Sequence, residues 1–397
     1  MQDKPSIEVI SKGTYGCILK PSLNCKGQIE NDVNYITKIQ KSTKVSMRES
    51  SIGEKIKKYD KYFAPVLKTC AVSLATVDDD ELEKCEFINK QDTNAKYESN
   101  KIKYVGEYSL IDYFEKKTAS SKDAKKFMKQ IINSHLILLD GINLLFSLGI
   151  IHYDLKANNI ICQTNNGRPI LIDFGMSVDI TKFENPDYDY EDAFGIYGPE
   201  YGPWCIDICV LTYMTTVIGK TWKDKTMTRK DIKKIINDYI TKNTGIADFV
   251  TMQEQRDFKQ KLEDYFRPFE EKPWQLVLDD LLKYKGTWDN YSLSYIFLQM
   301  LNDLSITQYV SKYGYLDKYI QLLKQVLLSI PVERLDAAAT IAKVNEIFEN
   351  VPREDNDKFK QELMVDFTDE AKQKNRLRRV NVTKLNTINS ENKIYSQ

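Results

Sequence analysis

The sequence predicts an α+β fold in which a small β-rich part precedes a larger, mainly helical part. Between residues 5 and 40, β-branched and aromatic residues form short runs that Gly and Asn separate. After residue 107, apolar residues recur at helical spacing instead. We therefore expect residues 1–107 to form the first part and residues 108–350 the second, followed by a polar, charged tail at 351–397.

The first part is predicted to contain strands, one helix and an insertion. The runs IEVI, GCILK and VNYITKI are expected to be strands. A helix is expected over residues 45–63, where apolar residues share one helical face. Further strands are expected in 64–107, interrupted by a polar insertion. Its acidic run, Asp78–Glu83, is expected to be a solvated loop.

The second part is predicted to be helical apart from two short strands. These strands, NNIIC and PILIDF, flank the turn at Asn165–Pro169. Helical patterns cover residues 109–116, 122–148, 204–218, 229–243, 255–264, 274–284, 292–302, 315–329 and 336–349.

Composition excludes several classes of protein. Apolar residues make up 42% of the 397 residues and charged residues 29%, which suits a chain that buries a core and stays in solution. The 57 basic residues balance 57 acidic ones, so no net field favours nucleic acid or a membrane surface as a partner. The most apolar stretch, Leu136–Ile151, contains Asp140 and is too short to span a bilayer. The sequence does not indicate an oligomeric state.

The seven cysteines do not form a metal-binding pattern. No pair has C-x-x-C spacing, and Cys205 and Cys209 lie far in sequence from His135 and His152. We therefore expect no zinc site. The cysteines are scattered along the chain and their total number is odd, which predicts reduced thiols and a cytoplasmic location.

Three polar residues in the second part suit phosphoryl transfer. That reaction needs a carboxylate that orients the attacking hydroxyl, and oxygen ligands for the metal that holds the phosphates. Asp154 suits the first role, and Asn159 and Asp173 suit the second, because Mg²⁺ prefers oxygen ligands. A loop after a helix carries Asp154 and Asn159, and the end of the next strand carries Asp173, so the three can converge on one site.

These residues resemble the signature motifs of protein kinases. His152-Tyr-Asp154-Leu-Lys156-Ala-Asn-Asn159 is similar to the catalytic loop H-R-D-x-K-x-x-N, and Asp173-Phe-Gly is similar to D-F-G. The resemblance implies a two-lobed kinase fold that uses ATP and Mg²⁺ on a protein substrate. It implies that Asp154 and Lys156 are catalytic, and that Asn159 and Asp173 bind the metal.

The N-terminal part extends the resemblance to the nucleotide-binding residues. Its segment Ser11-Lys-Gly-Thr-Tyr-Gly-Cys-Ile18 is similar to the glycine-rich loop G-x-G-x-x-G-x-V, with Ser11 in place of the first glycine. By resemblance, the residues that contact the nucleotide are Ser11, Gly13, Thr14, Tyr15, Gly16, Ile18 and, on the strand after the catalytic loop, Ile161.

Lys38 resembles the kinase lysine that grips the α- and β-phosphates. Ile36, two residues before it, stands where kinases have a small residue beside adenine. Kinases pair this lysine with a glutamate on the next helix, and two candidates are Glu49 and Glu54. Glu49 shares the inward face of that helix with Ile52, so we favour Glu49 over Glu54.

The motifs that follow match less closely. Gly198-Pro-Glu200 resembles the A-P-E that ends the kinase activation segment, and Arg334 resembles the arginine with which this glutamate pairs. Kinases also place an aspartate at the start of a later helix, and whether Asp207 takes this role stays open. The matches span residues 7 to 348. The segments YGCILKP, YFAPV and YGPEYGPW resemble those of kinases encoded by large DNA viruses. This narrower resemblance implies a location in the host cytoplasm or the virion.

Two substitutions bear on specificity and regulation. Lys156 is typical of Ser/Thr kinases, so we expect transfer to Ser or Thr. Tyr153 replaces an arginine that usually holds a phosphate on the activation segment, and a tyrosine cannot form a bidentate phosphate contact. We therefore expect activity without phosphorylation of that segment. Two alternatives are a pseudokinase scaffold and a small-molecule kinase such as a choline or aminoglycoside phosphotransferase.

Overall fold

A computed structural model of the protein describes residues 7–349, except for 14–15, 31, 76, 78, 86–87, 89–95, 121–123 and 310–313. The expected nucleotide contacts Thr14 and Tyr15 lie outside the described residues, as does the tail at 351–397. The described chain has mixed helix and antiparallel sheet content, in agreement with the α+β class. The boundaries at residues 107 and 350 stay predictions.

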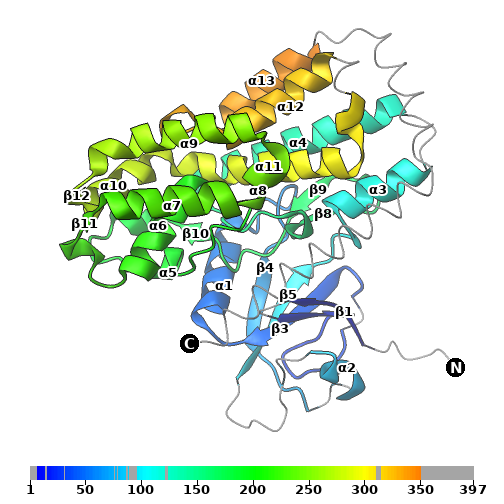
Figure 1. Ribbon diagram of the computed structural model, residues 1–397. Coiled ribbons are helices and arrows are strands. Elements are labelled where there is room, and N and C mark those ends of the chain that lie inside the picture. The colour runs from blue at the N-terminus through cyan, green and yellow to red at the C-terminus, as the bar shows by residue number, and fades with distance from the viewer. Residues whose placement is uncertain are drawn as a thin grey trace, which may run out of the picture.

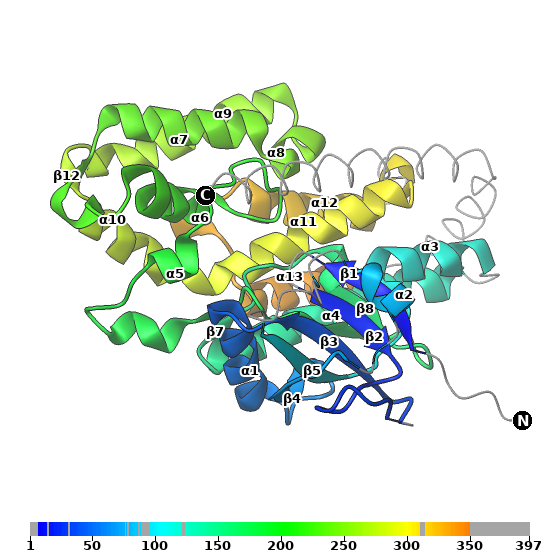
Figure 2. The same cartoon turned by 90° about the horizontal axis from the view of Figure 1, so that it is seen from below.

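The N-terminal part is a five-stranded antiparallel sheet with the strand order β1-β2-β3-β5-β4. Figure 1 shows the sheet on one side of the helical part, with α1 beside it, and Figure 2 shows α1 alongside the strands. The elements are β1 (Glu8–Gly13), β2 (Gly16–Lys20), β3 (Tyr35–Lys41), α1 (Lys44–Ile56), β4 (Val66–Ala71) and β5 (Tyr97–Lys103).

Helix α1 is shorter than the predicted helix at 45–63. A capping box between Thr43 and Ser46 starts it, and the apolar periodicity holds as far as Ile56. The chain then turns, and Phe63 forms a bridge with Leu171 in the helical part. The apolar residues after Ile56 therefore belong to the connection between the two parts and do not extend the helix.

The acidic run in the insertion was expected to be a solvated loop, but residues 79–83 of it are helical, and Asp78 lies outside the described residues. The helical residues form the short helix α2 (Asp79–Glu83), because two of them find partners on the sheet. Leu82 is buried in a small apolar cluster on the sheet, and a Glu81 carboxylate oxygen accepts a hydrogen bond of 3.0 Å from the backbone N–H of Val9 on β1.

Four cysteines of the sheet part are paired, and the expectation of reduced thiols is wrong for them. One disulfide joins Cys17 on β2 to Cys85 after α2, and the other joins Cys25 to Cys70 on β4. Sequence spacing does not reveal which cysteines the fold brings into contact, so the scattered positions gave no indication of these disulfides. Cys162, Cys205 and Cys209 are free and buried.

Reduction of the two disulfides is expected to destabilise the protein. They close segments with sequence separations of 68 and 45 residues. In the chain-entropy account, closing loops of this length stabilises by about 4 kcal/mol each, at the upper end of the roughly 2–4 kcal/mol that disulfides typically contribute. Urea unfolding with and without dithiothreitol measures the loss, and a Cys25→Ser/Cys70→Ser variant should show about half of it. Equal stability in both conditions would contradict the pairing.

The helical part surrounds a large apolar core, to which most of the helices given below contribute side chains. No helix among the described residues has the length and hydropathy needed to cross a bilayer. Its helices are α3 (Leu110–Ser120), α4 (Ala124–Ser147), α5 (Glu191–Phe194), α6 (Ile206–Tyr213), α7 (Arg229–Lys242), α8 (Thr244–Phe249), α9 (Met252–Phe266), α10 (Trp274–Leu281), α11 (Trp288–Asp303), α12 (Gly314–Leu327) and α13 (Ala337–Glu349).

Small antiparallel sheets hold the loops that carry the candidate site. The pair β7-β10 flanks the segment from residue 152 to 177, and the sheet β6-β8-β9 has two of its strands within that segment. A second pair, β11-β12, lies far from it in sequence. Their strands are β6 (Tyr108–Ser109), β7 (Ile150–Ile151), β8 (Ile160–Cys162), β9 (Pro169–Leu171), β10 (Val178–Asp179), β11 (Thr226–Met227) and β12 (Lys272–Pro273).

Candidate active site

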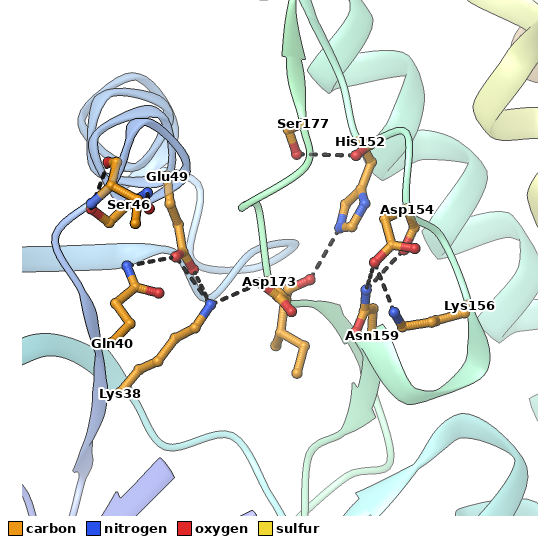
Figure 3. Close-up of polar contacts among 12 residues, drawn as sticks. Lys38, Gln40, Ser46, Glu49, His152, Asp154, Lys156, Asn159, Asp173 and Ser177 are labelled. Carbon is orange, nitrogen blue, oxygen red and sulfur yellow. Dashed lines mark hydrogen bonds and ion pairs between the residues drawn. The ribbon is translucent and has the colours of Figure 1, made fainter. Parts of the chain in front are cut away.

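Lys38 on β3 is the centre of a buried charge cluster (Figure 3). Its ammonium nitrogen lies 3.0 Å from both carboxylate oxygens of Glu49 on α1 and 2.9 Å from Oδ1 of Asp173. Gln40 donates a further hydrogen bond of 3.3 Å to Glu49. Glu54, the alternative partner, is exposed and pairs with a neighbouring lysine on the same helix. The structure thus pairs Lys38 with Glu49 and connects the sheet to the helical part through Asp173.

The two carboxylates of this cluster stabilise the Lys38 cation. Burial alone would lower the pKa of Lys38, but the carboxylates of Asp173 and Glu49 outweigh burial and raise this pKa above its usual range. Burial raises the pKa of Asp173 in turn, yet the Lys38 ammonium reverses this and holds the pKa of Asp173 below its usual range. Lys38 therefore stays charged at neutral pH.

The catalytic-loop residues converge on the carboxylate of Asp154. Lys156 donates to its Oδ2 at 2.8 Å, and Asn159 donates to the same oxygen at 3.1 Å. The hydroxyl of Tyr201 donates to its Oδ1 at 2.9 Å. The sequence placed the first three residues in one loop, and Tyr201 is an addition that the sequence analysis missed. Its position next to the Gly198-Pro-Glu200 motif is the one signal that could have drawn attention to it.

Asp289, another residue that the sequence analysis missed, holds the backbone of this loop. It lies in the first turn of α11, and its carboxylate accepts hydrogen bonds from the N–H groups of His152 (2.7 Å) and Tyr153 (2.9 Å). Tyr153 has φ +69°, a left-handed conformation that is costly for a bulky residue and needs such support. Asp289 thus holds the backbone of His152 and Tyr153 from the start of α11, and whether Asp207, in the first turn of α6, takes the helix-start role of kinases stays open.

Side-chain packing orients Asp173 toward the cluster. Phe174, the next residue, is buried between the rings of Phe63 and His152. The ring of His152 also makes a hydrogen bond of 3.0 Å with the carbonyl of Ile172. Asp173 has φ +60°, a left-handed backbone conformation, so the chain turns at this residue, two positions after the end of β9. The side chain of Asp173 is 39% exposed, which leaves it accessible to a ligand.

The residues at this position fit a magnesium ion bound together with phosphates. Asp173 offers a carboxylate, and Asn159 offers an amide oxygen, because its amide nitrogen is already turned to Asp154 (Figure 3). Mg²⁺ is usually held by one or two such protein ligands, with water and phosphate oxygens in the other positions. Within the described residues, no group of three His, Cys, Asp or Glu residues forms a complete metal cage. The donor set therefore suits a metal that arrives with a nucleotide.

The expected nucleotide-binding residues of the sheet share one face of it. Ile18 lies opposite Lys38 in the β2–β3 register, and Ile36 is two residues before Lys38, so all three point to the same side. Ile18, Ile36 and Ile161 are half-buried and can cover a flat ring. Gly16 has a packing reason to be glycine, because a Cβ would lie 2.6 Å from the carbonyl oxygen of Ile39. The roles of these residues in nucleotide binding stay predictions.

Arg334 has a different partner from the one that the resemblance implied. Its guanidinium forms an ion pair of 2.7 Å with Asp207 on α6, and both side chains are almost completely buried. The guanidinium also donates to Thr287, and Trp288 donates to the other oxygen of Asp207. Asp207 thus replaces Glu200 as the ion-pair partner, because α6 places it in the interior beside α11.

The segment between Asp173 and Glu200 is tied to α1 by charged contacts. Lys55 pairs with Asp179 at 2.7 Å. Lys44 pairs with the Asp192 carboxylate at 3.4 Å, and Arg48 donates a hydrogen bond of 2.8 Å to the Asp192 carbonyl.

Tyr153 makes no such charged contact among the residues that the structure describes; it is buried with its ring against Phe194 and Trp204. Tyr153 is thus part of the apolar packing beside this segment.

A family comparison agrees with this geometry. The model of the protein kinase domain matches residues 88–196, which include Asp154, Asn159 and Asp173. The match spans less than half of the chain and supports a protein kinase family for it. A search of curated proteins finds no match to this chain.

Proposed function

We propose that this protein is an ATP- and Mg²⁺-dependent protein kinase that phosphorylates Ser or Thr residues of other proteins. The family match supports phosphoryl transfer to proteins in general terms. The sheet and the helical part would be the two kinase lobes, with the nucleotide between them. A location in the cytoplasm and a viral origin belong to the same proposal and rest on the sequence alone.

The observation that carries the proposal is the contact of Lys38 with both Glu49 and Asp173. Lys38 and Asp173 are 135 residues apart in sequence and come from different parts of the molecule. The Lys38 ammonium bridges Glu49 on α1 and Asp173 after β9. A group that would bind phosphate, Lys38, and a group that would bind the metal, Asp173, therefore lie side by side. Such an arrangement suits a triphosphate with its metal better than it suits a structural ion pair.

The residues of the chain have distinct tasks in this reaction. When bound, ATP would supply the γ-phosphoryl group and leave as ADP, and Mg²⁺ would neutralise much of the phosphate charge. Lys38 would bind the α- and β-phosphates, held in place by Glu49. Asp154 would accept a hydrogen bond from the substrate hydroxyl and orient it toward phosphorus. Lys156, 2.8 Å from Asp154, would neutralise negative charge that develops during transfer.

Asp154→Asn is expected to reduce transfer of phosphate from ATP to a mixed protein extract by about 10²–10⁴-fold. An amide cannot accept the substrate proton as a carboxylate can, although it has nearly the same shape. Radiolabel transfer with Mg²⁺, followed by phosphoamino-acid analysis, measures both rate and residue type. Phosphotyrosine alone would contradict Ser/Thr specificity. A wild-type protein that binds ATP but transfers no phosphate would favour the pseudokinase alternative.

Phosphatase treatment of the purified protein is expected to leave most of its activity intact. The carboxylate of Asp192 and the side chain of Asp179 already provide the negative charges that bind Lys44 and Lys55 on α1. No phosphate is then needed to hold α1, and Glu49 with it, close to Lys38. The measurement is the transfer rate before and after treatment, with mass spectrometry to show that phosphate was removed. Loss of most activity would contradict the prediction.

A further inference from the structure

The contact between Tyr201 and Asp154 is a direct link between the end of the Gly198-Pro-Glu200 segment and the candidate catalytic carboxylate. We propose that Tyr201 is a positioning residue, which fixes the Asp154 carboxylate and leaves a single acceptor position for the substrate hydroxyl. The proposal rests on the proposed function, since it assigns a task to Tyr201 within that reaction.

The hydrogen bonds to Asp154 define the remaining acceptor position. A carboxylate has about four lone-pair sites, two on each oxygen. Oδ2 accepts from Lys156 and from Asn159, which occupies both of its sites. Oδ1 accepts from Tyr201, its one donor among the residues that the structure describes. The second site on Oδ1 is therefore the place where an incoming hydroxyl can donate, beside the phenol oxygen of Tyr201.

Tyr201 is suited to this task because its hydroxyl stays protonated. Burial, and then the negative charge of Asp154, raise the pKa of Tyr201 well above its ordinary value. The phenol therefore keeps its proton and donates a hydrogen bond to Asp154. A donor fixed on Oδ1 also prevents the carboxylate from turning about its Cβ–Cγ bond.

The backbone of Tyr201 is held by the surrounding helices. Asn243 is fully buried, and its amide nitrogen donates to the carbonyls of Tyr201 (3.1 Å) and Trp204 (3.3 Å). Its amide oxygen accepts from the first turn of α8. The Tyr201 ring packs edge-on against Trp204, whose indole N–H donates to the carbonyl of Tyr153.

Helix α11 holds the backbone near both Asp154 and Tyr201. Asp289 in its first turn holds the backbone that leads to Asp154, and Ser292 donates a hydrogen bond of 2.7 Å to the carbonyl of Pro203. One helix thus fixes the loop that carries the carboxylate and the segment that carries the tyrosine. The 2.9 Å contact therefore joins two side chains whose backbone segments are both held by α11.

Tyr201→Phe tests the proposal, because it removes one oxygen and keeps the ring. The turnover number for protein phosphorylation should fall about ten- to a hundredfold, the effect of one hydrogen bond to a charged group. The dissociation constant for ATP with Mg²⁺ should not change, since Tyr201 does not contact Lys38 or Asp173. Tyr197→Phe is the matched control: Tyr197 lies in the same segment, but its hydroxyl donates to Asp238.

The outcomes separate the alternatives. A lower turnover number with unchanged ATP affinity and unchanged melting temperature supports the positioning role. Unchanged turnover, or a parallel fall in turnover, ATP affinity and melting temperature, would overturn it in favour of a purely structural tyrosine. If Tyr201→Phe does not fold, Asn243→Ser takes its place, because serine can still cap α8 but cannot hold the Tyr201 carbonyl. Wild-type protein that neither binds ATP nor transfers phosphate would refute the proposed function itself.

Discussion

Asp173→Asn is expected to abolish the dependence of ATP binding on Mg²⁺ and to lower phosphoryl transfer by about 10³-fold. The neutral amide is a much weaker metal ligand than the carboxylate. A catalytic metal is worth several kcal/mol of charge stabilisation, and each 1.36 kcal/mol corresponds to about a tenfold change in rate. Asp173 also holds the Lys38 ammonium at 2.9 Å, so its charge orients the phosphate-binding group as well.

Isothermal titration with ATP, with and without Mg²⁺, measures the first effect, and radiolabel transfer measures the second. Asp60→Asn is the matched control, because Asp60 is an exposed carboxylate that also pairs with one lysine, Lys103. It should leave both quantities unchanged. If Asp173→Asn binds ATP with the same Mg²⁺ dependence as the wild type, then Asp173 is not a metal ligand and the proposed arrangement of the site is wrong.

Local spacing explains which parts of the site could be predicted from the sequence. Asp154, Lys156 and Asn159 lie in one short loop, so their proximity follows from chain connectivity. The pairing of Lys38 with Glu49 could be inferred because helical periodicity places Glu49 and Ile52 on one face, and both are buried.

The contacts that the sequence analysis missed or misassigned depend on tertiary packing. Asp289 lies 137 residues from His152, and the predicted helix began only at residue 292, so the first turn of α11 was not considered. Arg334 selects Asp207 because α6 brings that carboxylate into the interior, and no periodic pattern reveals this. The disulfides are missed for the same reason, since strand pairing brings their cysteines together.

Arg334→Met is expected to lower the free energy of unfolding by about 3–5 kcal/mol, because it leaves the Asp207 carboxylate buried without its cation. The side chains of the pair are 1% and 0% exposed, so water cannot replace the lost partner. The guanidinium also connects α6 to Thr287 just before α11, the helix whose Asp289 supports the catalytic loop. A loss of this size is a large fraction of the roughly 5–15 kcal/mol that stabilises an ordinary domain.

Urea unfolding of three variants distinguishes a buried ion pair from ordinary loss of packing. Lys57→Ala removes an exposed ion pair with Glu54 and should cost no more than about 1 kcal/mol. Arg334→Met combined with Asp207→Asn should be more stable than Arg334→Met alone, since the asparagine removes the uncompensated charge and can still accept from Trp288. If the double variant is less stable than the single one, packing and not the buried charge determines the effect, and the ion pair is not what joins α6 to α11.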